Sequence, residues 1–143
     1  LREENLSLFR SRINAYAKDL DPEIFMRKIT PDLEVKLEDL NLNFIRELEL
    51  LEPYGVGNPK PVFLTRALAV KAKPERLTPE TLRFWASDGM LTFEALWSER
   101  FAQRRFSLEK GMQLDLVYSV KLKTWNGNQS LALDIKDILP HLP

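Results

Sequence analysis

A short segment rich in proline and glycine separates two parts of the chain whose hydrophobic residues recur with different periods. Residues 53–61 read Pro-Tyr-Gly-Val-Gly-Asn-Pro-Lys-Pro, and this composition excludes both a continuous helix and a continuous strand. Before the segment, apolar residues recur every three or four positions, which indicates amphipathic helices. After it they alternate with polar residues, which indicates strands with one buried face. The sequence therefore predicts a helical segment, a shaped joint over residues 53–61, and a β-rich domain.

The part before the joint predicts two helices. The first covers residues 4–19 and carries an apolar face made of Leu6, Phe9, Ile13, Tyr16 and Leu20. A short extended piece is expected over residues 33–37, where apolar and charged residues alternate. The second helix is expected over about residues 42–51, with Asn41 or Asn43 as its N-cap. Its predicted buried face consists of Phe44 or Ile45, Leu48 and Leu51.

The part after the joint predicts five strands and one short helix. The strands are expected at residues 62–72, 81–87, 90–97, 113–125 and 129–138. Asp88-Gly89 and Asn126-Gly127 predict hairpin turns, because glycine accepts the positive φ that such turns require. The helix is expected over residues 98–107, between the third and fourth strands.

Three strands, a helix and two strands form the order of an OB-fold, a five-stranded Greek-key barrel. An SH3-like barrel would lack the helix. The predicted fold class is mostly β with N-terminal helices, namely a five-stranded OB-fold barrel preceded by a helical linker segment. The predicted domains are residues 1–52 for the linker, 53–61 for the joint and 62–143 for the barrel.

Composition narrows the class of protein further. The 143-residue chain has no cysteine, which excludes disulfides and thiolate metal sites and is typical of a cytoplasmic protein. No apolar run approaches the ~20 residues of a membrane helix, so no membrane partner is expected. Residues 1–61 carry 9 Lys+Arg and 12 Asp+Glu, a balance of −3, whereas residues 62–143 carry 12 and 9, a balance of +3. A mildly basic C-terminal half is compatible with a polyanionic partner. Because the chain opens at Leu1 within a helical pattern, we expect a segment of something longer.

The outward side chains of the predicted strands suggest a ligand for the barrel. Single-stranded nucleic acid is held by basic side chains along its phosphates and by aromatic rings that stack on its bases. Period-two alternation would bring such side chains from separate strands together on the outside of the barrel. The predicted nucleic-acid-binding set is Lys71, Lys73, Arg83, Trp85, Lys121, Lys123 and Trp125.

Each member of this set also has a structural interpretation. Lysines on strand exteriors also serve solubility and edge protection. Trp85 would be covered if the N-terminal helices packed over it, and Trp125 would pin its hairpin if it packed across the turn. Trp97 is expected in the core. Arg104 and Arg105 are expected on a solvated helix face, and no role is predicted for His141.

The joint residues have a separate prediction. Gly55, Gly57, Asn58 and Pro59 are expected to set the backbone geometry between the linker and the barrel rather than to contact a ligand.

Three segments carry a resemblance to a known family. Residues 50–63, which include the joint, closely resemble the joint sequence of RecJ-family single-stranded-DNA-specific exonucleases. Trp125-Asn126-Gly127 and the apolar alternation that leads to Lys136-Asp137-Ile138 are similar to the last hairpin of that family. The first helix is similar to the segment that leaves the family's DHH-associated domain. The resemblance covers essentially the whole chain in the right order.

The resemblance implies a role in DNA recombination and repair. A parent protein of this family would degrade single-stranded DNA from its 5′ end with Mn or Mg held by aspartates and histidines. This chain has one histidine and no Asp-His-His motif, so no catalytic residue, metal ligand or cofactor is predicted in it. The metal is expected in catalytic domains outside this segment. Asp115, Asp134 and Asp137 lie on predicted strands, and the sequence predicts no histidine beside them.

Three classes of function follow. The preferred hypothesis is a module that binds single-stranded DNA and feeds it to catalytic domains. A second is a protein-interaction module for an acidic, hydrophobic tail such as that of a single-strand-binding protein. A third is a structural strut that holds the parent's domains in register. No small-molecule substrate is expected.

Overall fold

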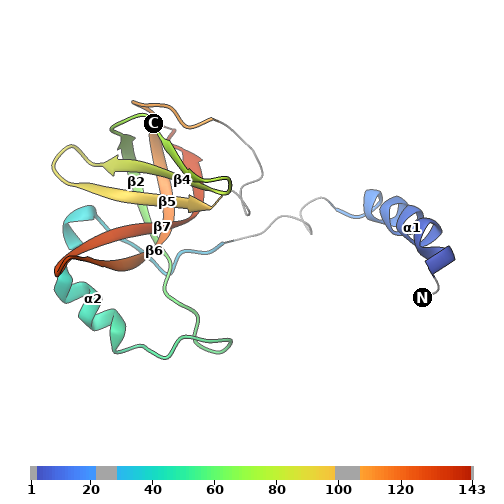
Figure 1. Cartoon of the computed structure of the whole chain (residues 1–143), viewed down its shortest axis with the longest axis horizontal. Coiled ribbons are helices and arrows are strands. Elements are labelled where there is room, and N and C mark those ends of the chain that lie inside the picture. Colours follow the sequence, from blue (N-terminus) through green and yellow to red (C-terminus); the bar gives the residue numbers. More distant parts are fainter. Residues whose placement is uncertain (1–2, 22–28, 99–106, 143) are drawn as a thin grey trace.

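The computed structural model describes residues 3–21, 29–98 and 107–142. A 3-10 turn at Glu3–Asn5 leads into α1 (Leu6–Lys18), which lies apart from the β-barrel in Figure 1. The helix predicted over residues 4–19 is therefore present, and none of its residues is buried. Within the described ranges, no helix combines the length and the apolar character needed to cross a lipid bilayer.

Five strands close into the barrel. They are β2 (Phe63–Val70), β4 (Thr81–Ser87), β5 (Thr92–Ser98), β6 (Gln113–Trp125) and β7 (Asn128–Pro140). The order around the sheet is β2-β6-β7-β5-β4, and a pairing between β2 and β4 completes the circle. β5 and β7 run parallel, and the other neighbours in the barrel are antiparallel. The predicted OB-fold barrel is confirmed.

Two short strands extend the sheet. β1 (Leu33–Glu34) pairs in parallel with β2 and occupies the start of the predicted extended piece. β3 (Glu75–Thr78) pairs with β4 and was not predicted. Every residue of β3 is exposed, so it has no buried face and lacks the alternation that marks a strand in a sequence. Its backbone pairing with β4 holds it in place.

The limits of β2, β5 and β7 differ from the prediction by one or two residues at each end. β2 ends at Val70, so Lys71 and Lys73 follow this strand instead of belonging to it. β5 begins at Thr92, because the Asp88 carboxylate accepts the Met90 and Leu91 backbone N–H groups at 2.9 and 2.8 Å. The helix predicted over residues 98–107, with Arg104 and Arg105, falls almost wholly outside the described residues.

The barrel interior is filled by alternate residues of the strands. Phe84 and Ala86 on β4, Ala95 on β5 and Leu133 on β7 are almost completely inaccessible. Trp97 is also buried, as predicted. The side chains next to them in sequence must therefore point outward.

One end of the barrel is covered by the segment before the joint. After the 3-10 turn η3 (Leu37–Asp39), α2 (Leu42–Glu49) begins at the predicted cap Asn41, whose carboxamide oxygen accepts the Phe44 N–H at 3.0 Å. Ile45 is buried, and the Phe44 ring lies 5.3 Å from the Phe63 ring of β2. Leu51 is half exposed, because α2 ends at Glu49. The prediction that Leu51 joins the buried face was wrong.

A buried hydroxyl pair ties the same segment to the barrel. The Thr65 hydroxyl donates to the Val35 carbonyl at 2.7 Å, so it accepts the Tyr118 hydroxyl proton across its other 2.7 Å contact. Burial raises the pKa of Tyr118 to about 12. Tyr118 therefore remains a neutral donor through the physiological pH range.

The turn between β6 and β7 gives a first test of the fold. Gly127 has φ +79°, so alanine there is strained even though nothing lies within 4 Å of the added methyl group. We expect Gly127→Ala to lower the free energy of unfolding by about 1 kcal/mol, measured by urea denaturation. Gly57→Ala is the control, because its methyl group also meets open space and Gly57 has no positive φ. Equal effects of the two substitutions would contradict the turn geometry.

Candidate nucleic-acid interface

Cross-strand pairing places one row of predicted residues across the outside of the barrel. The Lys71 N–H donates to the Trp85 carbonyl at 2.9 Å, and Trp85 pairs with Glu94 of β5. Glu94 pairs with Ala132 of β7, and Ala132 pairs with Lys121 of β6. The row therefore runs Lys71, Trp85, Glu94, Ala132, Lys121 over four strands and the end of β2.

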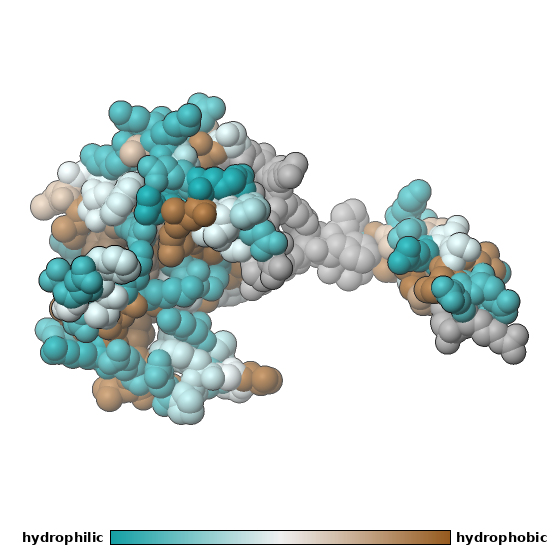
Figure 2. Space-filling view, viewed as in Figure 1, coloured by the Kyte–Doolittle hydropathy of each residue, from teal (hydrophilic) through white to brown (hydrophobic). Residues whose placement is uncertain are grey.

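A second row lies beside the first. Glu75 of β3 pairs with Arg83 of β4, which pairs with Leu96 of β5. Leu96 pairs with Asp134 of β7, and Asp134 pairs with Ser119 of β6. Hydrophilic residues cover most of the barrel face seen in Figure 2, and the brown hydrophobic residues on it lie in separate groups. The two rows define what we call the outer face.

Carboxylates pair with the cations near Trp85. Arg83 forms ion pairs with Glu75 and, at 3.8 Å, with Glu94. Lys123 of β6 also contacts the Glu94 carboxylate. The hydrogen bond to Glu75 is the main reason that the pKa of Arg83 is raised. Glu94 therefore lies between Arg83 and Lys123, directly opposite Trp85.

A second carboxylate organises the other end of the face. Asp134 Oδ2 accepts Lys121 Nζ at 3.0 Å and Lys136 Nζ at 2.7 Å. Burial alone would raise the pKa of Asp134, but the hydrogen bonds from Lys136 and Lys121 outweigh it and hold that pKa below its ordinary value. Asp134 is therefore a permanent anion near neutral pH.

The structure brings most of the predicted binding set together. The residues on or beside the outer face are Lys71, Arg83, Trp85, Lys121 and Lys123. Trp85 is 43% exposed, so the N-terminal helices do not cover it. Lys73 lies in the connection between β2 and β3, and Trp125 lies at the tip of the β6–β7 hairpin. Trp125 is 78% exposed, so packing across the turn buries little of it.

Sequence reasoning missed the acidic members of this face. Glu94 and Asp134 occupy outward positions of their strands, which alternation alone would have found. Their contacts with cations of other strands depend on cross-strand register, which a single strand does not reveal. Lys136 was not predicted as a binding residue, and the structure shows that it contacts Asp134.

His141 has a partner, so the prediction that it has no role was wrong, as was the expectation that no histidine lies beside Asp115. Its Nδ1 lies 2.6 Å from Asp115 Oδ1, and its backbone N–H donates to the Gln113 carbonyl. The same Asp115 oxygen accepts the Ala67 N–H at 2.9 Å, and Arg66 contacts the other oxygen at 3.4 Å. Ala67 has φ 56° at a bulge in β2, so Asp115 holds a strained backbone.

This cluster predicts a pH dependence of stability. Burial would raise the pKa of Asp115, but the Ala67 N–H, His141 and Arg66 outweigh burial and lower it. A lowered folded-state pKa gives stability that is present above the unfolded pKa of about 3.9 and lost as pH falls through the folded value. We expect Asp115→Asn to lower the free energy of unfolding at pH 7 by about 1–2 kcal/mol. The free energy of unfolding of this variant should also fall less steeply as the pH is lowered.

Urea denaturation from neutral to acidic pH measures this effect. Asp19→Asn, at the exposed C-terminal end of α1, provides the matched control. If the acid-dependent loss kept the same slope in Asp115→Asn as in Asp19→Asn, the cluster would have no role in it.

The joint is held by its own hydrogen bonds. Asn58 donates from its carboxamide to the Leu51 and Pro53 carbonyls at 2.6 and 3.2 Å, and its backbone pairs with Gly55. No atom lies within 4 Å of a methyl group added at Gly55 or Gly57. The backbone role of Gly55, Gly57, Asn58 and Pro59 in setting the geometry between the linker and the barrel remains a prediction.

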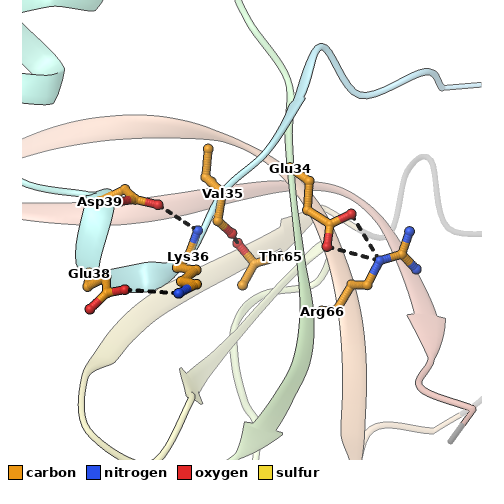
Figure 3. A pocket seen from close by; sticks show the side chains of 7 residues that line it. All are labelled: Glu34, Val35, Lys36, Glu38, Asp39, Thr65 and Arg66. Carbon is orange, nitrogen blue, oxygen red and sulfur yellow. Dashed lines mark hydrogen bonds and ion pairs between the residues drawn. The ribbon is translucent and has the colours of Figure 1, made fainter.

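A pocket of about 460 Å³ lies away from the predicted set, between the β1–η3 segment and β2. Figure 3 shows that the charged residues lining this pocket are already paired with one another. Arg66 contacts Glu34, Lys36 Nζ contacts Glu38, and the Lys36 N–H donates to Asp39. The pocket contains none of the predicted binding residues.

No group of three or more metal-ligating side chains is found in residues 3–21, 29–98 and 107–142. Asp115 and His141 are two such side chains, and that carboxylate also accepts the Ala67 N–H and contacts Arg66. The described residues therefore do not fit the Mn or Mg centre that the family resemblance implies for the parent.

Two known proteins match most of this chain in sequence. The chain is 24% identical over 139 residues to the single-stranded-DNA-specific exonuclease RecJ of Bacillus subtilis, covering 96% of this chain and 18% of that protein. It is 27% identical over 133 residues to RecJ of Thermus thermophilus, covering 91% of this chain and 18% of that protein. The chain thus spans about a fifth of the length of these relatives.

A solved structure extends the match to the fold. The crystal structure of Thermus thermophilus RecJ in complex with Mn2+ superposes with a TM-score of 0.67 and 25% identity, over 100% of this chain and 20% of that one. The model of the RecJ OB domain matches residues 31–137, a range that includes β1, α2, the joint and almost the whole barrel. The chain therefore belongs to the RecJ OB domain family.

Proposed function

We propose that this domain binds single-stranded DNA on its outer face and belongs to a longer RecJ-like 5′→3′ exonuclease. The observation that carries the proposal is the register row from Lys71 through Trp85 to Lys121, which joins an exposed indole to cations of separate strands on one face. Membership in the RecJ OB domain family supports it. The parent's use in recombination and repair, its cytoplasmic location and its Mn- or Mg-dependent chemistry in other domains are parts of the same proposal, and this segment contributes no catalytic group.

When DNA binds on this face, its phosphates would have to replace carboxylates as the partners of the cations. Arg83, Lys121 and Lys123 already contact Glu94 or Asp134. A DNA phosphate must therefore compete with carboxylates that stay on the protein, which lowers the net gain per contact. A base stacked on Trp85 adds about 1–3 kcal/mol that does not depend on this competition. We therefore expect weak binding in which stacking is essential.

The test is a titration of labelled oligothymidylate at low salt, with duplex DNA of matched length as the comparison. We expect a preference for the single strand and an affinity that falls as salt rises. Equal affinity for single-stranded and duplex DNA would refute the proposal.

A protein partner is the second candidate, because the same indole and cations could accept an acidic, hydrophobic peptide tail such as that of a single-strand-binding protein. The double substitution Lys121→Glu and Lys123→Glu would weaken the binding of both DNA and the peptide. Competition separates them. A peptide that binds tightly while oligothymidylate neither binds nor displaces it would favour the protein-interaction module.

The strut is favoured by a different observation, namely apolar side chains that the described residues leave uncovered. Leu8, Phe9 and Ile13 of α1 are each about half exposed, and Val56 at the tip of the joint is fully exposed. A strut predicts that substitutions on the outer face leave the parent's DNA affinity unchanged.

A further inference from the structure

The end of the joint lies beside the carboxylate that organises one end of the outer face. Ser119 of β6 donates its hydroxyl to the Pro61 carbonyl at 2.9 Å. Ser119 is also the cross-strand partner of Asp134. The residue before Pro61 is Lys60, so the joint brings a further lysine to the Asp134 end of the second row.

Two lysines therefore contact one carboxylate, and the joint brings a third lysine to the same end of the face. Lys121 of β6 and Lys136 of β7 both contact the same oxygen, Asp134 Oδ2, and Lys60 enters from the joint. Three positive charges against the single charge of Asp134 leave an excess of two. Lys121 and Lys136 keep half and a third of their side-chain surface exposed, so a second anion can approach these side chains.

We propose that Lys60, Lys121 and Lys136 form a phosphate-binding subsite, which takes one backbone phosphate of single-stranded DNA at the joint end of the outer face. This inference rests on the proposed function and adds to it a residue of the joint. The strand would run from Trp85 toward the joint, with a base at the indole and a phosphate at the three lysines.

The electrostatics of Lys60 agree with such a subsite. Its pKa is lowered, first by partial desolvation and next by the charge of Lys121, with Lys136 acting in the same direction. Asp134 and, more weakly, Glu52 oppose this shift. A bound phosphate would relieve the repulsion among the ammonium groups, which Asp134 alone does not neutralise.

A structural interpretation gives a different expectation for the same residues. If the lysines only balanced the single charge of Asp134, the two that contact it would be more than sufficient, and Lys60 would contribute nothing to DNA affinity. Replacing Lys60 is therefore the discriminating change. It leaves both Asp134 ion pairs in place and removes one charge from the joint.

The experiment measures the affinity of the purified chain for labelled oligothymidylate as a function of salt, for the wild type, Lys60→Gln and Lys18→Gln. Lys18, in the last turn of α1, provides the same change of charge away from the barrel. Loss of one phosphate contact is expected to reduce the slope of log K against log salt by about 0.7 and to weaken binding near 50 mM salt roughly 5- to 10-fold. Lys18→Gln should match the wild type.

Asp134→Asn tests the subsite in the opposite direction. It removes the competing carboxylate and leaves the three lysines, so we expect tighter binding of oligothymidylate. An unchanged or weaker affinity, with the fold intact by circular dichroism, counts against the subsite.

The outcomes separate this inference from the proposed function. If the wild type binds and Lys60→Gln behaves like Lys18→Gln, the subsite is refuted and the outer face still binds DNA. If the wild type does not bind DNA, the proposed function fails, and titration with inorganic phosphate followed by backbone amide shifts decides the subsite alone. Shifts at Lys60, Ser119 and Lys121 would support it, and their absence would refute it. If oligoaspartate displaces the DNA with the same dependence on Lys60, the assignment to a nucleic-acid phosphate is wrong.

Discussion

Replacing Phe84 with alanine is expected to lower the free energy of unfolding by about 3–5 kcal/mol. Phe84 points into the barrel from β4 and keeps 1% of its surface accessible. Its removal would leave a cavity among strands that close on one another, where neighbouring side chains have little freedom to move in. A domain of this size has a total stability of only about 5–15 kcal/mol, so the variant would be near its folding limit at 37 °C.

Urea denaturation monitored by tryptophan fluorescence measures this effect. Phe84→Leu is the conservative comparison and should recover most of the loss, because leucine fills much of the same space. A loss below about 1 kcal/mol for Phe84→Ala would mean that the inner face of β4 is not packed as described.

Replacing the next residue, Trp85, with alanine is expected to change binding instead of stability. Its side chain points to the outer face and is 43% exposed. Loss of one stacked base corresponds to about 1–3 kcal/mol, or roughly a 5- to 150-fold weaker affinity for oligothymidylate. The slope of affinity against salt should stay unchanged, because no charge is removed.

Trp85→Phe provides the matched control for stacking. It keeps an aromatic ring and should retain most of the affinity, whereas Trp85→Ala should not. Both variants should unfold at nearly the same urea concentration as the wild type. An unchanged affinity in Trp85→Ala would remove the indole from the proposed interface.

The sequence predicted the barrel well because its signals are local. Alternation over residues 113–125 marked β6 to the residue, and Asn126-Gly127 marked the turn that follows, where both residues adopt positive φ. Membership of the outer face also follows from alternation, which separates Phe84 from Trp85 without knowledge of the fold.

The contacts of the site were harder to predict because they depend on register between strands. Lys123 meets Glu94, which lies 29 positions earlier in the chain. A bulge at Ala67 in β2 and another at Lys136 in β7 shift the pairing by a residue, and neither has a glycine or proline to mark it. The contact between His141 and Asp115 depends on β7 continuing to Pro140, two residues beyond the predicted strand. The domain limits at residues 52 and 61 remain a prediction.

The closure of the barrel has a consequence for its motions. β2 and β4 pair at Ala69 with Ser87 and at Val70 with Ala86, and one further backbone bond joins Lys71 to Trp85, whereas β6 and β7 pair along almost their whole length. Local opening begins where the fewest hydrogen bonds must break, so amide protons at this seam should exchange with solvent sooner than those between β6 and β7. Trp85 lies beside the seam. A strand of DNA stacked on Trp85 would hold this seam closed. Its binding should therefore slow the exchange of the Lys71 amide proton, which donates to the Trp85 carbonyl.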